Sequence, residues 1–428
     1  MFADRKQSRR EFLGSLAKAV SACFVLPAAA ALRAEEDPYD TITLPSPVKS
    51  VIFLNMVGGM SHVDTFDPKP DSVFAHVDSA IKGVKLAETF KQTAQVLSAV
   101  SLVRTLRSED GAHDFAQHLV HTGYRFTESQ GFPDIPSMGS VIAYARTRRD
   151  TGPYFPSCII INDRGRGGDG GFLGVKYAGF HVSNPQKALQ NLLGDSNMPA
   201  ERLTRREKLL GILNDSFFSR NPQASYLAWK QMFESALSFM NSDKLSVFEL
   251  DKMAPALRAK FGNSRIGSSL ALAYRLAERE TPYIQVNVGG WDTHSNNRNK
   301  ISEICRDLDP ALATLLGELK SSGLLSQTLF VLTSEFGRTP EVGGKDGRDH
   351  YPKIFTGLIG GGPVAGGMVL GETDAKGEKA VKESWHQKQF LATMYRAAGI
   401  DCEAQLMTPS GRPFPLSPRE TKLISQLL

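Results

Sequence analysis

The chain has 428 residues, with 50 Lys and Arg against 45 Asp and Glu, which gives a formal net charge of +5. Six basic and two acidic side chains lie in residues 1–34, which leaves 44 basic and 43 acidic residues in the remainder. This near-neutral balance argues against a nucleic-acid partner, which would require a clustered basic face.

The N-terminus resembles a twin-arginine export signal. Ser8-Arg9-Arg10-Glu11-Phe12-Leu13-Gly14 precedes a moderately apolar stretch that ends in small residues near Ala31. We therefore treat residues 1–34 as a signal peptide and expect a periplasmic or secreted protein. Val20-Ser21-Ala22-Cys23 also resembles a lipoprotein cleavage site, which would leave Cys23 lipidated. No later stretch has the ~20 apolar residues that a transmembrane helix needs, so no transmembrane span is expected.

The remainder is expected to be a surface linker at 35–48, followed by one α/β domain at 49–428. Short continuous apolar runs predict buried strands, and apolar residues at helical spacing predict amphipathic helices. The predicted strands are 50–57, 101–103, 157–161, 283–288, 329–333 and 354–359. The predicted helices are 86–99, 112–121, 137–148, 264–279, 300–321 and 386–398, with a helical insertion at 185–260 that covers one side of the sheet.

Two further features of the chain allow alternatives. The glycine-rich loop at 163–171 is either a mobile rim loop or an anion cradle formed by backbone N–H groups. Cys158, Cys305 and Cys402 form neither a disulfide framework nor a zinc motif, although a single bridge would be compatible with the sequence.

Three predicted strands end in residues that bind metals. The strand at 50–57 leads to Asp64, the strand at 283–288 to Asp292 and His294, and the strand at 329–333 to Glu335. Open α/β sheets place their sites beyond the carboxyl ends of their strands, so these side chains should meet at one edge. Imidazole with carboxylate suits zinc, iron or manganese.

Other polar residues are candidates for the same site. His350 lies in a loop bounded by Gly, Asp and Pro, which makes a core position improbable. Asp67 competes with Asp64 as a ligand, although an Asp before Pro is also common in turns. His113 opens a predicted helix, where an anion is favoured.

The neighbouring histidines and arginines have less specific patterns. His118 and His121 follow His113 on the same helix, and packing explains them better than ligation. Arg338 and Arg348 flank two candidate ligands and could bind an oxyanion in bidentate fashion or form structural ion pairs.

Four local motifs resemble the alkaline phosphatase/sulfatase-like superfamily, and in particular a secreted bacterial domain-of-unknown-function branch of it. They are Gly58-Gly59-Met60-Ser61-His62-Val63-Asp64, Gly290-Trp291-Asp292-Thr293-His294, Ser334-Glu335-Phe336-Gly337-Arg338 and Gly347-Arg348-Asp349-His350. The resemblance implies a mostly parallel sheet between helix layers, in an alkaline-phosphatase-like sandwich. It also implies one or two divalent metal ions, namely zinc, manganese, iron or calcium.

The resemblance assigns roles by position. Asp292 and His294 match the superfamily's middle ligand pair and His350 its last ligand, while Glu335 stands where an Asp-His pair is expected. Gly58-Gly59 stands where the first Asp is expected, so Asp64 would substitute for it. His113 occupies the nucleophile position, where Ser, Thr or Cys is expected.

These features predict a metal-dependent hydrolase of phosphate or sulfate esters that lacks the usual nucleophile. Asp292, His294 and His350 would hold the primary metal, with Glu335, Asp64 and His113 at a second ion or the substrate. Arg338 and Arg348 would steady the oxyanion. The alternatives are a non-catalytic protein that binds sulfated or phosphorylated glycans, and a structural envelope protein.

Overall fold

The computed structural model describes residues 42–70, 72–126, 135–150, 154–162, 167–188, 200–220, 224–240 and 242–428. The predicted signal peptide, most of the predicted linker and residues 163–166 of the glycine-rich loop lie outside these ranges. Within the described part, no helix is long and apolar enough to cross a membrane.

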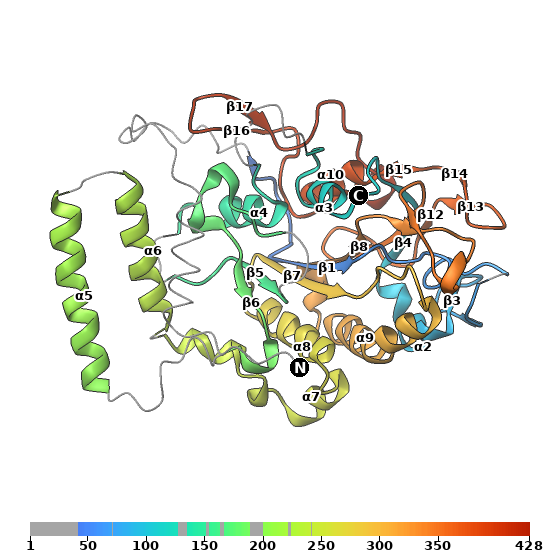
Figure 1. Cartoon of the computed structure of the whole chain (residues 1–428), viewed down its shortest axis with the longest axis horizontal. Helices are drawn as coiled ribbons and strands as arrows, with labels where there is room; N and C mark the ends of the chain where they lie inside the picture. Colours follow the sequence, from blue (N-terminus) through green and yellow to red (C-terminus); the bar gives the residue numbers. More distant parts are fainter. Residues whose placement is uncertain are drawn as a thin grey trace.

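A nine-stranded sheet forms the centre of the molecule (Figure 1). Its order is β12-β4-β11-β8-β1-β7-β5-β6, and β15 adds to β4. The strands are β1 (Ser50–Val57), β4 (Ser101–Arg107), β5 (Cys158–Ile161), β6 (Phe180–Val182), β7 (Tyr283–Gly289), β8 (Thr328–Ser334), β11 (Phe355–Gly360), β12 (Val369–Leu370) and β15 (Trp385–His386). All pairings are parallel except those of β11, which runs antiparallel to β4 and β8.

The apolar composition of the central strands explains their position. β1 reads SVIFLNMV and is buried along nearly its whole length, because helices cover both of its faces. Alternate residues of β1 divide between two apolar clusters: Ile52 and Leu54 face one side, and Val51 and Phe53 face the other.

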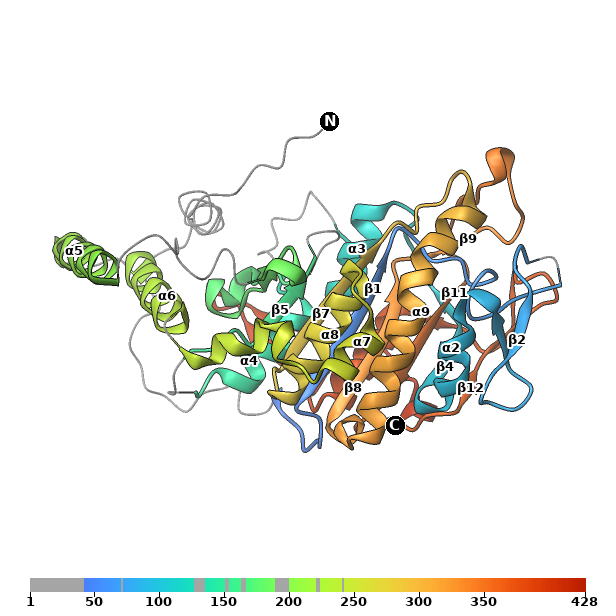
Figure 2. The same ribbon diagram turned by 90° about the horizontal axis from the view of Figure 1, so that it is seen from below.

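Helices form a layer on each face of the sheet (Figures 1 and 2). One layer holds α2 (Lys91–Val96), α7 (Pro255–Phe261), α8 (Arg265–Glu278) and α9 (Asn297–Ser321). The other holds α3 (His113–Thr122), α4 (Met138–Thr147) and α10 (Gln387–Ala397). The prediction of a mostly parallel sheet between helix layers is confirmed.

Several helix ends follow the expected local chemistry. Gly123 adopts a left-handed conformation with φ 77° and ends α3. His386 caps α10, since its Nδ1 accepts the N–H of Lys388 while Gln389 bonds back to the N–H of His386. The first turn of α2 is capped from another element, because Asp309 of α9 accepts the N–H groups of Gln92 and Thr93.

The remaining strands and the 3-10 helices are short and lie mostly around the sheet. Small two-stranded sheets pair β2 (His76–Asp78) with β3 (Lys85–Ala87), β9 (Gly337–Arg338) with β10 (His350–Tyr351), β13 (Glu372–Thr373) with β14 (Ala380–Lys382), and β16 (Gln405–Met407) with β17 (Pro413–Pro415). The 3-10 helices are Glu88–Phe90, Leu97–Ala99, Gly171–Leu173, Val175–Tyr177, Pro185–Lys187, Asp243–Phe248, Leu250–Lys252, Leu324–Gln327, Gly344–Asp346 and Ser425–Leu427.

Three predictions about local structure need correction. The helix expected at 86–99 begins only at Lys91, because residues 85–87 pair with β2. The end of the predicted surface linker packs onto the body, since Ile42 and Val48 are buried. In the helical insertion expected at 185–260, α5 (Ala200–Arg220) and α6 (Ala224–Met240) extend beyond the β6 edge of the sheet (Figures 1 and 2). The later part of that segment, including Val247, Phe248 and α7, packs in the apolar cluster on one face.

The cysteine residues of the described chain are not bridged. Cys158, Cys305 and Cys402 are all free and buried. Burial raises the pKa of the Cys158 thiol, so it behaves as a small apolar side chain rather than as a nucleophile.

Candidate metal centre

The candidate site lies beyond the carboxyl ends of β1, β7 and β8, near α3 and β9 (Figure 2). The loops after β1 and β7 cross closely here. A Cβ atom on Gly58 would lie 2.4 Å from the backbone nitrogen of Asp292, and Gly58 has a φ of +117°. Only glycine can occupy this position without strain, and Gly58 therefore allows the loops after β1 and β7 to pack against each other at the same edge of the sheet.

Asp292 is at the centre of a cluster of imidazoles. Its Oδ1 lies 3.1 Å from Nε2 of His294 and 3.4 Å from Nε2 of His350. Its Oδ2 lies 3.5 Å from Nε2 of His113. Within the described residues, His113, Asp292 and His350 offer ligand atoms that all lie within 4.8 Å of one another.

Hydrogen bonds at the far side of each ring fix its tautomer. Nδ1 of His350 lies 2.6 Å from the carbonyl oxygen of Gly111, and Nδ1 of His113 lies 3.0 Å from Oε1 of Glu335. Nδ1 of His294 lies 2.9 Å from Oδ1 of Asp349. Carbonyl and carboxylate oxygens accept, so Nδ1 donates in each case, and in the neutral ring Nε2 keeps its lone pair.

The resulting donor set fits a metal ion. The Nε2 atoms of His294 and His350 lie 3.0 Å apart, so two lone pairs face each other beside the carboxylate of Asp292. Such an arrangement is repulsive unless a proton or a cation lies among these atoms. Imidazole nitrogens oriented by a second hydrogen bond, together with a carboxylate oxygen, are typical ligands of zinc and other transition metals.

Arg338 fixes Asp292 in place. Its Nη2 donates to Oδ1 of Asp292 at 2.5 Å, and its Nε donates to the carbonyl of Gly59 at 3.0 Å. Nη1 donates to the carbonyl of Arg348 at 3.0 Å, and Nη2 also bonds the carbonyl of Gly58. The side chain of Arg338 is fully buried and its nitrogens are all engaged, so it orients Asp292 rather than facing an incoming oxyanion.

The charges within the cluster shift its pKa values in opposite directions. Burial acts to raise the pKa of Asp292, but the hydrogen bond and charge of Arg338 outweigh it and lower the pKa. The hydrogen bond to Glu335 raises the pKa of His113. Burial lowers the pKa of His350. Asp292 therefore stays ionised and His350 stays neutral at neutral pH, which is the state in which each binds a metal.

Glu335 supports the cluster from behind. Its Oε1 accepts the N–H of Gly58 at 2.8 Å as well as the Nδ1 proton of His113, and its Oε2 accepts from Nε2 of Gln117 at 2.7 Å. The carboxylate is fully buried. The sequence suggested Glu335 as a ligand, but in the structure Glu335 contacts the cluster only through the ring of His113.

Asp64 and Arg348 are bonded to each other and do not face the cluster. Oδ2 of Asp64 accepts from Nε of Arg348 at 2.6 Å, and Oδ1 accepts from Nη2 at 2.8 Å. Asn297 donates to the same carboxylate at 2.8 Å. Both charged side chains are fully buried. Of the two alternatives for Arg348, oxyanion binding and a structural ion pair, the structure shows the ion pair.

The remaining sequence candidates also have structural partners. Asp67 is buried and bonds Lys69, Arg104 and Thr373. His121 packs edge-on against Phe53 in the core.

Three contributors to the site were missed at the sequence level: Asp349, Gln117 and the carbonyl of Gly111. For Asp349 and Gln117 the sequence contained a clue. Asp349 directly precedes His350, and Gln117 lies four residues after His113, on the same face of the helix.

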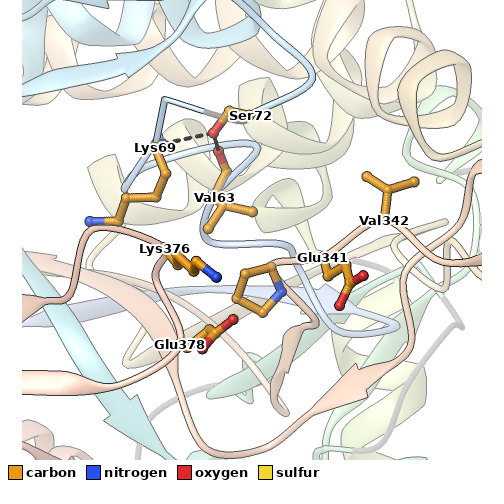
Figure 3. A pocket seen from close by; sticks show the side chains of 8 residues that line it. Val63, Lys69, Ser72, Glu341, Val342, Lys376 and Glu378 are labelled. Carbon is orange, nitrogen blue, oxygen red and sulfur yellow. Dashed lines mark hydrogen bonds between the residues drawn. The ribbon is translucent and has the colours of Figure 1, made fainter.

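A separate cavity of about 350 Å³ lies nearby (Figure 3). Its lining includes Val63, Lys69, Glu341, Lys376 and Glu378, and none of the cluster residues contributes to it. Val63 adjoins Asp64, and Arg348 bonds the carbonyl of Pro340, which also lines the cavity. The Asp64–Arg348 pair therefore connects two walls of this cavity.

The fold and the cluster define the class of protein: a mostly parallel α/β protein with a candidate metal centre at the carboxyl edge of its sheet. The chain belongs to the family described as "Protein of unknown function (DUF1501)", whose model matches residues 48–428. A search of curated proteins finds no match.

Solved structures with a similar fold have low sequence identity to the chain. The lipoteichoic acid synthase LtaP from Listeria monocytogenes is 8% identical with a TM-score of 0.38, over 88% of this chain and 78% of that one. The C-terminal periplasmic domain of EcEptC from Escherichia coli, in complex with Zn, is 8% identical with a TM-score of 0.39, over 92% and 91%. An alkaline phosphatase from the Antarctic bacterium TAB5 is 12% identical with a TM-score of 0.34, over 77% and 94%. At such values these likenesses say nothing about activity.

Proposed function

We propose that the protein is an exported metal-dependent hydrolase of phosphate or sulfate esters. The observation that carries the proposal is the convergence of three imidazole Nε2 atoms on Asp292, each ring oriented by an acceptor at Nδ1. The resemblance of the local motifs to the alkaline phosphatase/sulfatase-like superfamily supports the substrate class.

Asp292, His294 and His350 would hold the metal on the Oδ1 side of the carboxylate, with His113 on the Oδ2 side as a further ligand or as a base. A divalent metal bound there would supply Lewis-acid chemistry, which activates water and neutralises charge on an ester oxyanion. The side chains of Asp292 and His294 are each 47% exposed, so a small anionic ester can reach the cluster from solvent.

The chain's own residues supply orientation and proton transfer. Glu335 holds the Nδ1 proton of His113 and stabilises the imidazolium form, so Nε2 of His113 can take a proton from water or give one to a leaving group. Asp349 accepts the Nδ1 proton of His294, which orients that ring so that its Nε2 would bind the metal. Arg338 keeps Asp292 ionised and fixed.

The first experiment measures metal content. Protein purified after export would be analysed by elemental mass spectrometry, together with His350→Ala, Asp292→Asn and the control His181→Ala, an exposed histidine of β6 far from the site in sequence. The proposal expects stoichiometric metal in the wild type and the control, and loss of metal in the two site variants. A metal-free wild-type protein, or metal retained by both site variants, would refute a metal centre at this position.

The second experiment measures turnover of p-nitrophenyl phosphate, bis-p-nitrophenyl phosphate and p-nitrophenyl sulfate. Hydrolysis that disappears in His350→Ala and persists in His181→Ala is the expected result. Loaded protein that turns over none of these esters would contradict the hydrolase proposal.

One observation favours a second function, binding of a sulfated or phosphorylated glycan without hydrolysis. α3 begins with His113, whose Nδ1 is bonded to Glu335. At this position the alkaline phosphatase/sulfatase-like superfamily has a hydroxyl or thiol nucleophile. Tight glycan binding by metal-loaded protein, without release of phosphate or sulfate, would support this alternative.

A further inference from the structure

Helix α5 carries an apolar stripe on its exposed face. Leu209, Ile212 and Leu213 are each 58% exposed, and Phe217 is 48% exposed. Their spacing of three, four and eight residues places them on one face of the helix. The helix lies at the far edge of the molecule, beyond α6 (Figures 1 and 2).

Arginines extend this stripe at both ends. Arg202, Arg205 and Arg206 precede Leu209 by seven, four and three residues, and Arg220 follows Phe217 by three, so all four lie on the same face. All four are exposed. The acidic residue Glu201 precedes Leu209 by eight residues and lies at the margin of the stripe, where four arginines outnumber it. Asp215 lies on another side of the helix and bonds Lys230 of α6 at 2.6 Å.

Charge complementarity selects the partner. A second copy of α5, packed parallel or antiparallel, would bring arginines of one stripe against arginines of the other, and like charges in contact are unfavourable. An anionic surface has the opposite effect, because it attracts each arginine while the apolar residues enter its hydrocarbon boundary. A helix with this many charges lies in the plane of a membrane rather than crossing it.

We propose that the α5 stripe docks the protein on a membrane surface rich in anionic lipids. Leu209, Ile212, Leu213 and Phe217 would insert at the boundary between headgroups and acyl chains, and the four arginines would contact the headgroup phosphates. The site at the sheet edge is formed by other elements, so this docking is independent of the proposed hydrolysis.

The test is co-sedimentation of the exported protein with vesicles. Vesicles of phosphatidylcholine alone would be compared with vesicles containing about 30% phosphatidylglycerol, each at about 50 mM and about 500 mM NaCl. The variants are Ile212→Gln/Leu213→Gln and Arg202→Gln/Arg205→Gln. The control Lys187→Gln/Lys320→Gln removes two exposed positive charges that lie on other elements. All proteins share one N-terminus, so differences among them report on α5.

We expect binding to anionic vesicles that weakens at high salt, about tenfold weaker binding for each stripe variant, and a control within about twofold of the wild type. Circular dichroism should be unchanged, since the replaced side chains are exposed. Equal binding by all variants would overturn the proposal, as would absence of binding by the wild type. A dimer seen by sedimentation that becomes a monomer in Ile212→Gln/Leu213→Gln would also overturn it, by assigning the stripe to a second copy.

Discussion

Replacing Arg348 with methionine, while Asp64 is kept, should destabilise the protein strongly. The guanidinium forms two hydrogen bonds to the Asp64 carboxylate, and both side chains are fully buried. The variant leaves a buried carboxylate whose remaining side-chain donor is Asn297. The carbonyls of Thr339 and Pro340 also lose their donor.

The magnitude follows from the burial of the pair. Removal of one partner of a buried ion pair costs about 3–5 kcal/mol, whereas loss of a surface pair costs about 0–1 kcal/mol. Replacing both partners, as in Asp64→Leu/Arg348→Met, removes the uncompensated charge. The double variant should therefore lose at least about 2 kcal/mol less than the sum of the two single variants.

Equilibrium urea unfolding, followed by tryptophan fluorescence, gives the free energy of unfolding for the four proteins of this cycle. Metal content is measured on the same samples. Because neither side chain faces the cluster, the folded double variant should keep the metal stoichiometry of the wild type. A cost below about 1 kcal/mol for Arg348→Met would refute the reasoning on stability. A folded double variant that has lost its metal would show that the pair belongs to the site itself.

Three further predictions concern other contacts. Glu335→Gln should weaken metal binding by about 10- to 100-fold without abolishing it, because the substitution disturbs the orientation of His113 and leaves the ligands in place. Competition with a chelator measures the metal affinity, and an affinity equal to that of the wild type would contradict the prediction. Gly58→Ala should reduce stability and metal content together, because its Cβ would meet the backbone of Asp292 at 2.4 Å; a melting temperature and metal content equal to wild type would speak against that crossing. Burial, with a smaller effect of Lys388 and Arg107, lowers the pKa of His386 to about 4. As the pH falls from about 6.5 to about 4, His386 becomes protonated in the unfolded chain but stays neutral in the folded protein. The free energy of unfolding should therefore fall by about 2 kcal/mol across this window. His386→Asn keeps a capping side chain and should flatten this dependence in urea titrations, whereas an unchanged slope would contradict the assignment.

The central sheet could be predicted from the sequence because its strands are buried on both faces. β1 is an apolar run bounded by polar and glycine residues, and its predicted bounds of 50–57 match the structure. The helix expected at 86–99 shows the opposite situation. Leu86 has the spacing of a helical stripe, yet residues 85–87 pair with β2 in a short local hairpin, and a three-residue strand is too short to show an alternating pattern.

The candidate site was predictable in position and less so in detail. The rule that sites follow the carboxyl ends of parallel strands grouped Asp64, Asp292, His294 and Glu335, but Asp64 lies apart and bonds Arg348. His350, chosen from its loop and its motif, lies 3.4 Å from Asp292. The roles of the arginines depend on the paths of loops. Arg338 and Arg348 have similar sequence surroundings, but one reaches Asp292 beside the cluster and the other reaches Asp64 in the interior.

Arg338 also has a consequence for dynamics. A single guanidinium bonds the carbonyls of Gly58, Gly59 and Arg348 and the carboxylate of Asp292, so three loops far apart in the chain depend on one side chain. Opening any of these loops removes a partner from the other two, which should make them exchange their amide hydrogens as one cooperative unit. An ion bound to the cluster would favour only the closed form of that unit. Metal binding should therefore slow hydrogen exchange in all three loops by a common factor, including at amides that touch no ligand.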